Sequence, residues 1–258
     1  MTARAEAGPV EAGRRLYADV ESSTEEYARR FAGPVGEWFL ETQWLAARRL
    51  LAGVGPGARV LDVGGGHAQL VPGLVAAGFD VTVVGSDVSC AARLAPWLVA
   101  GRCRFQGGDL LALPFAGGDF EAALSVRLLP HLDDWERLIA ELCRVAARMV
   151  IVDYPSRRSV NAWADRLFAL KSRVEGNTRP FRVFHPAQIA EAFARHGFRA
   201  TASVPQFLLP MALHRFLTWR GLSQALEGLG ETAGLRGRFG SPVIVRAERL
   251  DPSGSLEA

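Results

Sequence analysis

Between residues 58 and 153, short apolar runs alternate with segments of helical periodicity, and this alternation constrains the fold more than any other feature. Apolar runs bounded by turn residues are typical of buried strands, and the intervening patterns are typical of amphipathic helices. The predicted strands are residues 59–63, 80–84, 102–106, 120–125 and 149–153, and the predicted helices are residues 69–77, 91–100 and 135–146. Strands that alternate with helices require a parallel sheet with helices on both faces. The sequence therefore predicts an α/β fold.

The flanking segments divide the chain further. Roughly the first twenty residues indicate a loose arm, and Ser22 to Glu26 then offers a capping box for helices that continue to about Leu51, interrupted near Gly33 and Pro34. Beyond the core, the predicted strands are 200–209 and 241–249, and the predicted helices are 159–174, 186–196 and 211–229. The predicted units are an N-terminal arm and helical lid over 1–53, a main domain over 54–250 with a substrate-covering insertion at about 156–235, and a tail over 251–258.

Composition argues against several classes of function. The formal net charge is +3, and the 30 basic residues, all arginine except Lys171, are scattered rather than clustered, so we expect no nucleic-acid partner. The 3 cysteines lie far apart without a CxxC spacing, and we expect neither disulfides nor a metal site. The N-terminus lacks the apolar core of a signal peptide, and no stretch approaches the ~20 apolar residues of a membrane span. These features predict a cytoplasmic protein.

The most informative motif is the glycine loop that follows the first predicted strand. Gly64, Gly65 and Gly66 remove every side chain where the backbone turns from a strand into a helix, which permits a ligand to approach the main chain closely. A phosphate-binding P-loop would require a lysine that is not there, and the GxGxxG pattern of dinucleotide folds has Gln69 where its third glycine should be. S-adenosylmethionine is the third ligand class that uses such loops. The structural alternative is a tight turn with no ligand.

Five motifs in order favour the third class. They are Leu61 to Leu70 (LDVGGGHAQL), Val83 to Ser89 (VVGSDVS), Gly108 to Phe115 (GDLLALPF), Asp119 to Ser125 (DFEAALS) and His131 to Val145 (HLDDWERLIAELCRV). With them the chain resembles the class I S-adenosylmethionine-dependent methyltransferases over about residues 27–154, particularly the branch that includes the ubiquinone and menaquinone-biosynthesis methyltransferases. The resemblance implies a Rossmann-like, seven-stranded, mostly parallel sheet with an antiparallel last strand and an N-terminal helical lid. Ala68 replaces the third glycine of the family motif, and Glu121 replaces an aspartate.

The resemblance also implies a cofactor site for S-adenosylmethionine. Asp87 would accept both ribose hydroxyls, or alternatively would only cap the next helix. Asp109 would accept the adenine amino group, and Leu110 would offer its backbone N–H to the ring. Other residues have similar implied roles: the loop glycines Gly64, Gly65 and Gly66 around the cofactor, Ser125 at its methionine portion, and the helix from Tyr27 to Phe31 as the lid. Val88 and Phe115 would lie on either side of the adenine, or alternatively would only belong to the core. His67, which follows the glycines, is a further candidate to contact the cofactor.

The residues that perform the chemistry are less constrained by the sequence. Methyl transfer from a sulfonium depends mostly on positioning, and a base is required only if the acceptor must lose a proton. His131 lies just beyond the fourth predicted strand and is a candidate base, with orientation of a helix as the alternative. Tyr154 and Asp153 end the fifth strand and are expected to face the same crevice.

The acceptor is expected to be a small molecule. Basic side chains, namely Arg127, Arg179 and His185, are candidates to bind an acidic or phenolic group, and aromatic residues between 155 and 220 indicate an apolar pocket. The resemblance to the family implies methyl transfer to an aromatic, quinone-like or polyketide-like metabolite, and we expect a monomer or homodimer. The alternatives are a nucleotide-dependent oxidoreductase and an inert metabolite-binding protein of the same fold.

Overall fold

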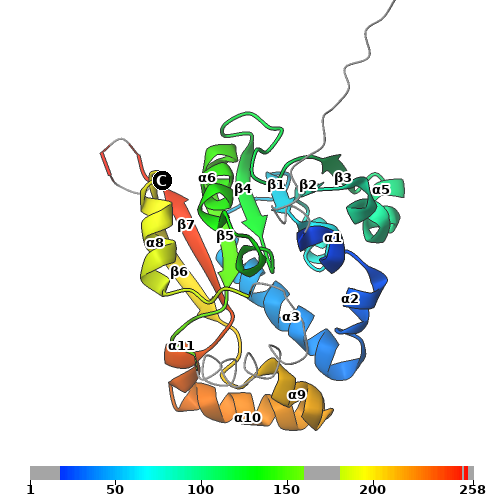
Figure 1. Cartoon of the computed structure of the whole chain (residues 1–258), viewed down its shortest axis with the longest axis vertical. Coiled ribbons are helices and arrows are strands. Elements are labelled where there is room, and N and C mark those ends of the chain that lie inside the picture. The colour runs from blue at the N-terminus through cyan, green and yellow to red at the C-terminus, as the bar shows by residue number, and fades with distance from the viewer. Residues whose placement is uncertain (1–17, 160–180, 252, 255–258) are drawn as a thin grey trace, which may run out of the picture.

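The computed structural model describes residues 18–159, 181–251 and 253–254, which build one seven-stranded sheet. The strands are β1 (Arg59–Val63), β2 (Asp80–Gly85), β3 (Cys103–Gly107), β4 (Phe120–Ser125), β5 (Ala146–Tyr154), β6 (Phe198–Pro205) and β7 (Val243–Arg249). Their order is β3-β2-β1-β4-β5-β7-β6, and β7 is antiparallel to both of its neighbours. The predicted mostly parallel sheet with an antiparallel last strand is therefore confirmed (Figure 1).

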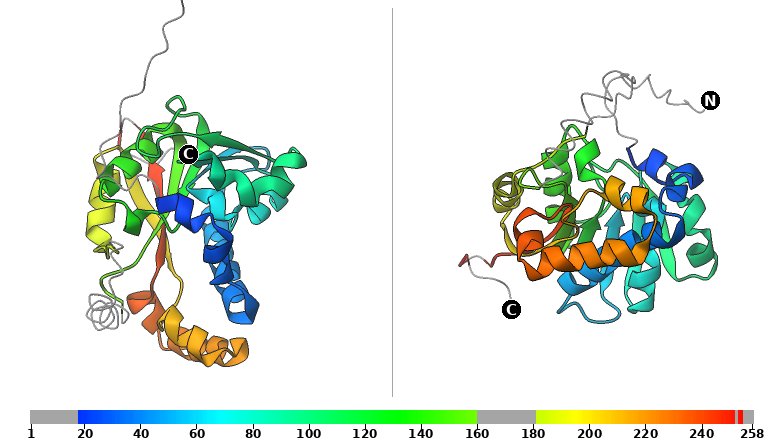
Figure 2. Two further views of the ribbon diagram at one scale, coloured as in Figure 1. Left: turned by 45° about the vertical axis from the view of Figure 1, so that its right-hand side comes forward. Right: turned by 90° about the horizontal axis from the view of Figure 1, so that it is seen from below.

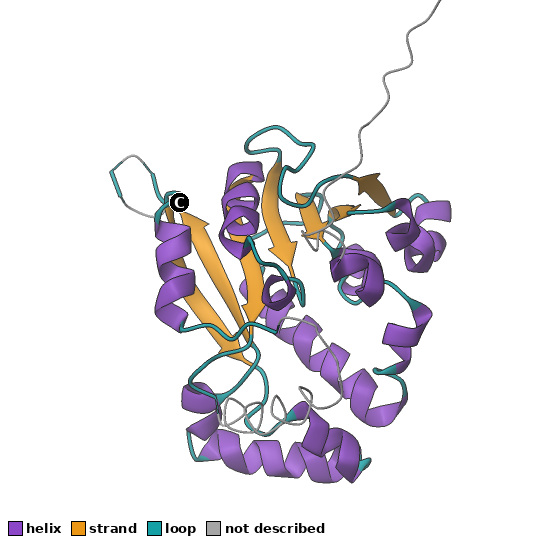
Figure 3. Ribbon diagram, in the orientation of Figure 1, coloured by secondary structure: helices purple, strands orange, loops and turns teal. Residues whose placement is uncertain are grey.

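Helices cover both faces of the sheet, as Figure 3 shows. On one face, α3 (Gly33–Leu50) and α4 (Val71–Ala76) bury Leu50 and Leu74 against strand residues such as Val60. On the other face, α6 (Trp135–Val145) and α8 (Pro186–Ala194) bury Leu138 and Phe193 against their own set of strand residues. Because parallel strands are buried on both faces, they consist of the continuous apolar runs from which they were predicted.

The N-terminal helices belong to two different parts of the molecule. Short helices α1 (Ala18–Ser22) and α2 (Glu25–Arg29) precede the sheet, and the side chain of Thr24 caps α2 by accepting a hydrogen bond from the Tyr27 amide. Helix α1 lies where the sequence indicates a loose arm. Helix α3, although expected within the lid, packs into the same hydrophobic cluster as the sheet. Among the described residues of the predicted lid, α3 therefore belongs to the packing of the sheet.

The connection between β6 and β7 adds a separate helical layer. It contains α9 (Met211–Leu217), α10 (Arg220–Thr232) and α11 (Leu235–Phe239), which lie beyond the lower ends of β5, β6 and β7 (Figures 1 and 2). The expected helix over 211–229 is divided at Thr218, whose φ is +54°. A cluster that includes Phe39 and Phe207 joins this layer to α3. The layer thus covers the edge of the sheet at which the parallel strands end, where open α/β folds form their sites.

The remaining elements are short. They are η1 (Gly65–His67), η2 (Val88–Leu94), α5 (Ala95–Val99) and η3 (Leu129–His131). The predicted helix over 91–100 is replaced by η2 and α5, and the predicted helix over 159–174 lies almost wholly outside the described residues. Within the described part of the chain, no helix has both the length and the apolar character needed to cross a membrane.

Candidate functional site

The glycine loop leaves β1 at the carboxyl edge of the sheet and is too crowded for side chains. Gly64 has a φ of +75°, and its N–H donates to the carbonyl of Val84 at 2.8 Å. A Cβ on Gly65 would overlap the carboxylate of Asp62, and a Cβ on Gly66 would lie 2.6 Å from the carbonyl oxygen of Cys90. Real Cβ atoms do not approach so closely, so the loop holds its shape only because these residues are glycines.

Asp62 places a buried carboxylate against this loop. The side chain is 1% exposed, and its Oδ2 has no hydrogen-bond partner among the described residues. Burial raises the pKa of Asp62 to about 7, because a charge in an apolar interior lacks the solvation of water. A buried acceptor without a donor is costly, and a ligand ammonium group would supply both the donor and the compensating charge.

Two further carboxylates follow the neighbouring strands, and both are exposed. Asp87 follows β2, and its Oδ1 accepts from the Ser89 amide at 2.8 Å, so the helix-capping role considered for this residue is present. Hydrogen bonding from Ser89 lowers the pKa of Asp87. Asp109 follows β3 and accepts from the Leu111 amide at 2.8 Å. Each carboxylate remains accessible to a ligand from the solvent side.

Four other residues expected at the cofactor occupy different environments. The Val88 side chain is 77% exposed beside Asp87, so a ligand ring could pack on it. Leu110 is buried, and the buried Ser125 hydroxyl donates to the carbonyl of Val63 at 3.1 Å, which ties β4 to the loop. The placement of Phe115 beside the adenine is wrong. Its ring packs on Phe120 with centroids 4.9 Å apart, at the amino end of β4 and therefore at the opposite edge of the sheet.

Helix α1 is fastened over the glycine loop by a carboxylate that sequence reasoning missed. Asp19 is 1% exposed and accepts from the backbone N–H and the hydroxyl of Ser86, at 2.7 and 2.5 Å. The Ser23 hydroxyl donates to the Asp19 carbonyl at 2.6 Å and would meet any side chain placed on Gly66. No local pattern could have revealed Asp19, because its partner is 67 residues away.

The predicted lid residues pack on the histidine of the loop. The rings of Tyr27 and Phe31 each meet the His67 ring edge-on, with centroids 5.4 Å apart. Burial, followed by the charges of Arg127 and Arg93, lowers the pKa of His67 to about 4. His67 is therefore neutral near pH 7 and serves as an aromatic contact between the lid and the loop.

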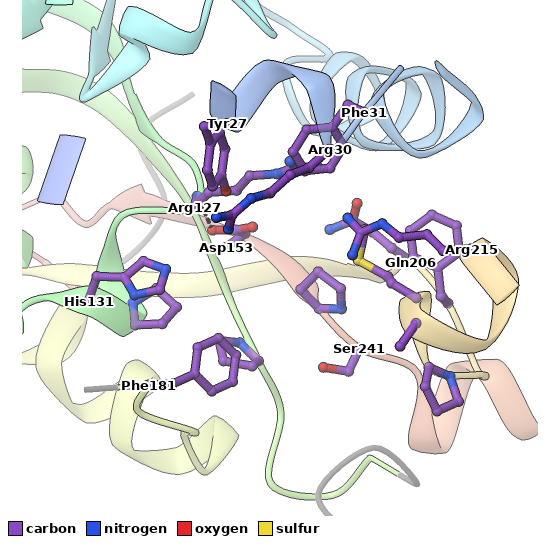
Figure 4. A pocket seen from close by; sticks show the side chains of 17 residues that line it. Tyr27, Arg30, Phe31, Arg127, His131, Asp153, Phe181, Gln206, Arg215 and Ser241 are labelled. Carbon is purple, nitrogen blue, oxygen red and sulfur yellow. Dashed lines mark hydrogen bonds between the residues drawn. The ribbon is translucent and has the colours of Figure 1, made fainter. Parts of the chain in front are cut away.

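A cavity of about 400 Å³ opens beside this lid and is shown in Figure 4. Its apolar lining includes Tyr27, Phe31, Phe181 and Phe207, which come from the lid, the segment before α8 and the segment after β6. Such a lining suits a flat apolar molecule. Polar side chains share the cavity with these rings, and they come from the segment after α2, from the strand ends at this edge of the sheet and from α9.

His131 and Asp153 both line this pocket. His131 ends η3, with its ring 5.9 Å from that of Phe181. Asp153 accepts from the Arg127 amide at 2.6 Å and from Gln43 at 3.5 Å. Burial raises the pKa of Asp153 to about 6, against the opposing effect of the Arg127 hydrogen bond and charge. The carboxylate is therefore mostly ionised near pH 7.

The expected catalytic role of Tyr154 is contradicted by its position. Successive residues of a strand point to opposite faces, and Asp153 faces the pocket. Tyr154 is 3% exposed, packs against Phe184, and borders a different cavity between α8 and β6. His185 is exposed before α8 and does not line the pocket, and Arg179 lies outside the described residues.

Comparison with known proteins agrees with this geometry. Residues 38–203 match the family model for the methyltransferase domain. The chain is 30% identical over 155 residues to a probable chloroplastic tocopherol O-methyltransferase of Oryza sativa subsp. japonica, which covers 55% of this chain and 41% of that protein. It is 33% identical over 81 residues to the norajmaline N-methyltransferase of Rauvolfia serpentina, covering 30% of this chain and 28% of that protein. The chain thus spans less than half the length of either curated relative.

Solved structures show the same fold. Magnesium protoporphyrin IX methyltransferase from Synechocystis PCC 6803, solved with bound S-adenosylhomocysteine, superposes with a TM-score of 0.61 at 16% identity, covering 88% of this chain and 96% of that one. The family match is consistent with the strand order β3-β2-β1-β4-β5-β7-β6 and with the glycine loop after β1. The chain belongs to the methyltransferase domain family, and its fold is that of the class I S-adenosylmethionine-dependent methyltransferases.

Proposed function

We propose that this protein transfers a methyl group from S-adenosylmethionine to a small-molecule acceptor that is aromatic, quinone-like or polyketide-like. The observation that carries the proposal is the unpaired, buried carboxylate of Asp62 beside a loop that admits no side chains, next to an aromatic pocket. The cofactor combines a cationic amino-acid portion with a nucleoside, and the residues present fit both. Asp62 would hold the amino group, Asp87 the ribose and Asp109 the adenine.

The pocket residues would position the acceptor and manage its proton. When bound, S-adenosylmethionine supplies a methyl group on an already activated sulfonium, so correct placement of the acceptor contributes most of the rate enhancement. Phe181 and Phe207 would hold an apolar acceptor and exclude water. His131 is the candidate to accept a proton from an acceptor hydroxyl or amine, since its ring lines the same pocket.

The alternative oxidoreductase function is disfavoured by the unpaired oxygen of Asp62. A dinucleotide would bring a pyrophosphate, which offers only hydrogen-bond acceptors, whereas the ammonium group of S-adenosylmethionine offers donors to this oxygen. Calorimetry with S-adenosylhomocysteine and, separately, with NADH tests the choice, and we expect binding of the first alone. Tight binding of NADH without the homocysteine product would contradict the proposal. Transfer of a labelled methyl group across a panel of phenolic and quinol acceptors would distinguish an enzyme from an inert binding protein.

Asp87→Ala is expected to weaken S-adenosylhomocysteine binding by about 10- to 100-fold. Each charge-assisted hydrogen bond to a ribose hydroxyl contributes ~1.5–3 kcal/mol. Because Asp87 is exposed, the fold should survive the change. Calorimetry measures the dissociation constant, with Asp133→Ala as a control that removes another exposed carboxylate. A lower melting temperature with an unchanged dissociation constant would show that Asp87 only caps η2.

Asp62→Asn is expected to stabilise the ligand-free protein at high pH and to weaken cofactor binding. The folded pKa of Asp62 is raised from 3.8 to about 7, so the stability it contributes is present below pH 3.8 and is lost as the pH rises to about 7. Asparagine stays neutral. The variant should therefore gain up to about 4 kcal/mol over the wild type above about pH 7, and much less near pH 4. Urea unfolding at both pH values measures this difference, with Asp133→Asn at an exposed carboxylate as a control. An equal gain at both pH values would contradict the prediction.

A further inference from the structure

Three arginine side chains converge on the acceptor pocket. Arg30 follows α2, Arg127 follows β4 and Arg215 belongs to α9, and Figure 4 shows all three extending toward the same space. Aromatic rings hold them in place. The guanidinium of Arg127 lies 4.0 Å from the centroid of the Phe31 ring, and that of Arg215 lies 5.5 Å from the same ring. Cations stacked on ring faces are fixed in direction while their N–H groups remain available.

These charges are not balanced within the described part of the pocket. Asp153 is the one carboxylate among the described lining residues, and its oxygens already accept from the Arg127 backbone and from Gln43. The pKa of Arg215 is lowered by burial and then by repulsion from Arg127 and Arg30. Three positive charges lie close together with one carboxylate beside them, and this arrangement indicates that the pocket binds an anionic ligand.

Two donors in the pocket are also unpaired. Nη1 of Arg127 and Nε2 of Gln206 are both shielded from solvent, and neither has a hydrogen-bond partner among the described residues. Gln206 is 2% exposed, and the pocket is bounded by this residue and by Arg127. Buried donors are nearly always satisfied in folded proteins, so each exception calls for a partner. Both groups require an acceptor atom, and the oxygens of an anion would serve both.

We propose that the methyl acceptor carries an anionic group, a carboxylate or a phosphate, which is bound by Arg127, Arg215 and Gln206. Its apolar body would lie toward Phe181 and Phe207. The inference rests on the proposed methyl transfer, and it narrows the acceptor from aromatic metabolites in general to those that bear a negative charge. Planar guanidinium groups match the paired oxygens of either anion, and the pocket offers two of them beside an amide donor.

Matched probes test the charge preference. In the presence of saturating S-adenosylhomocysteine, we expect the full-length protein to bind 2-naphthoate or 2-naphthyl phosphate at least about tenfold more tightly than neutral 2-naphthamide. The three probes share one ring system, so the comparison isolates the charge, and the two acids distinguish carboxylate from phosphate. Calorimetry measures each dissociation constant. Equal binding of the amide and both acids would overturn the inference.

Variants locate the binding group. Arg215→Met keeps an apolar stem and should abolish the preference for the acids, whereas Arg215→Lys should retain part of it. The matched control is Arg238→Met, which removes an exposed arginine outside the pocket and should change nothing. Melting temperatures check folding, and if Arg215→Met unfolds, Arg127→Met, which removes the other proposed guanidinium, replaces it. An acid preference that survives in whichever of the two variants is folded would overturn the assignment.

The two proposals fail separately. Binding of S-adenosylhomocysteine is titrated first, without any naphthyl probe, and its absence would overturn the proposed methyl transfer. The acid and amide titrations would then still decide whether the pocket selects anions. Conversely, the protein could bind S-adenosylhomocysteine and methylate only neutral acceptors. That result would support the proposed methyl transfer and overturn the proposal that the acceptor is anionic.

Discussion

His131→Ala is expected to lower kcat by the ~10²–10⁴-fold that follows removal of a general base, while the dissociation constant for S-adenosylhomocysteine stays within about twofold of the wild type. The separation is expected because His131 lines the acceptor pocket, whereas the carboxylates that would hold the cofactor lie in β1 (Asp62) or follow β2 and β3 (Asp87 and Asp109). The measurement uses the acceptor identified by the methyl-transfer panel, with kcat and KM determined separately.

The control for this variant is His196→Ala, which removes an exposed histidine beyond α8 that does not line the pocket. If His131 only orients η3 and the helix that follows, its replacement should lower the melting temperature and leave kcat nearly unchanged. A pH profile distinguishes the two roles as well, because loss of a base removes the limb of kcat/KM that reports its titration.

Glu227→Ala is expected to lower the free energy of unfolding by about 3–5 kcal/mol, because it removes the acceptor on which several buried donors depend. Glu227 is 3% exposed on α10 and accepts from Nε2 of His214 at 2.9 Å. It also accepts from the amides of Leu208 and Leu209, at 2.8 and 2.9 Å. Alanine would leave all three donors unpaired in the interior. Urea unfolding near pH 7 measures the loss.

This effect should depend on pH. Burial opposes the charge of Glu227, but the hydrogen bonds from His214, Leu208 and Leu209 hold its pKa below 4.5. Its contribution is therefore present above pH 4.5 and is lost as the pH falls through the folded pKa, so the difference between variant and wild type should shrink in acid. Glu231→Ala is the control. Glu231 lies on the same helix, and its replacement breaks a surface ion pair with Arg236 of α11; such pairs contribute at most about 1 kcal/mol. Equal losses for the two variants would contradict the assignment.

The positions of the residues proposed to hold the cofactor could be predicted because each belongs to a local motif. Gly64 to Gly66, Asp87 and Asp109 each follow a strand whose apolar run is visible in the sequence. In a parallel sheet the carboxyl ends of the strands meet at one edge, so the order of strands and motifs is enough to bring these residues together. The sequence also indicated that Asp87 could act as a cap, and the Ser89 amide is indeed its partner.

The errors arose where packing decides which way a side chain points. Tyr154 and Asp153 are adjacent at the end of β5, and the sequence alone does not reveal which of them faces the pocket, because both faces of this sheet are covered. Phe115 belongs to a family motif, but its ring packs at the amino edge of the sheet. Helix α1 was missed because its stability depends on the distant Ser86 rather than on its own five residues.

The sequence by itself determined the α/β class, the positions of the strands and the glycine loop, since these follow from the period of apolar residues and from turn chemistry along short stretches. Only the tertiary structure decided the acceptor pocket. Arg30, Arg127, Gln206 and Arg215 come from four separate segments, and no spacing in the chain relates them. Side chains so far apart in sequence come to line one pocket only when the helical layer between β6 and β7 packs against the segment that carries Tyr27 and Phe31.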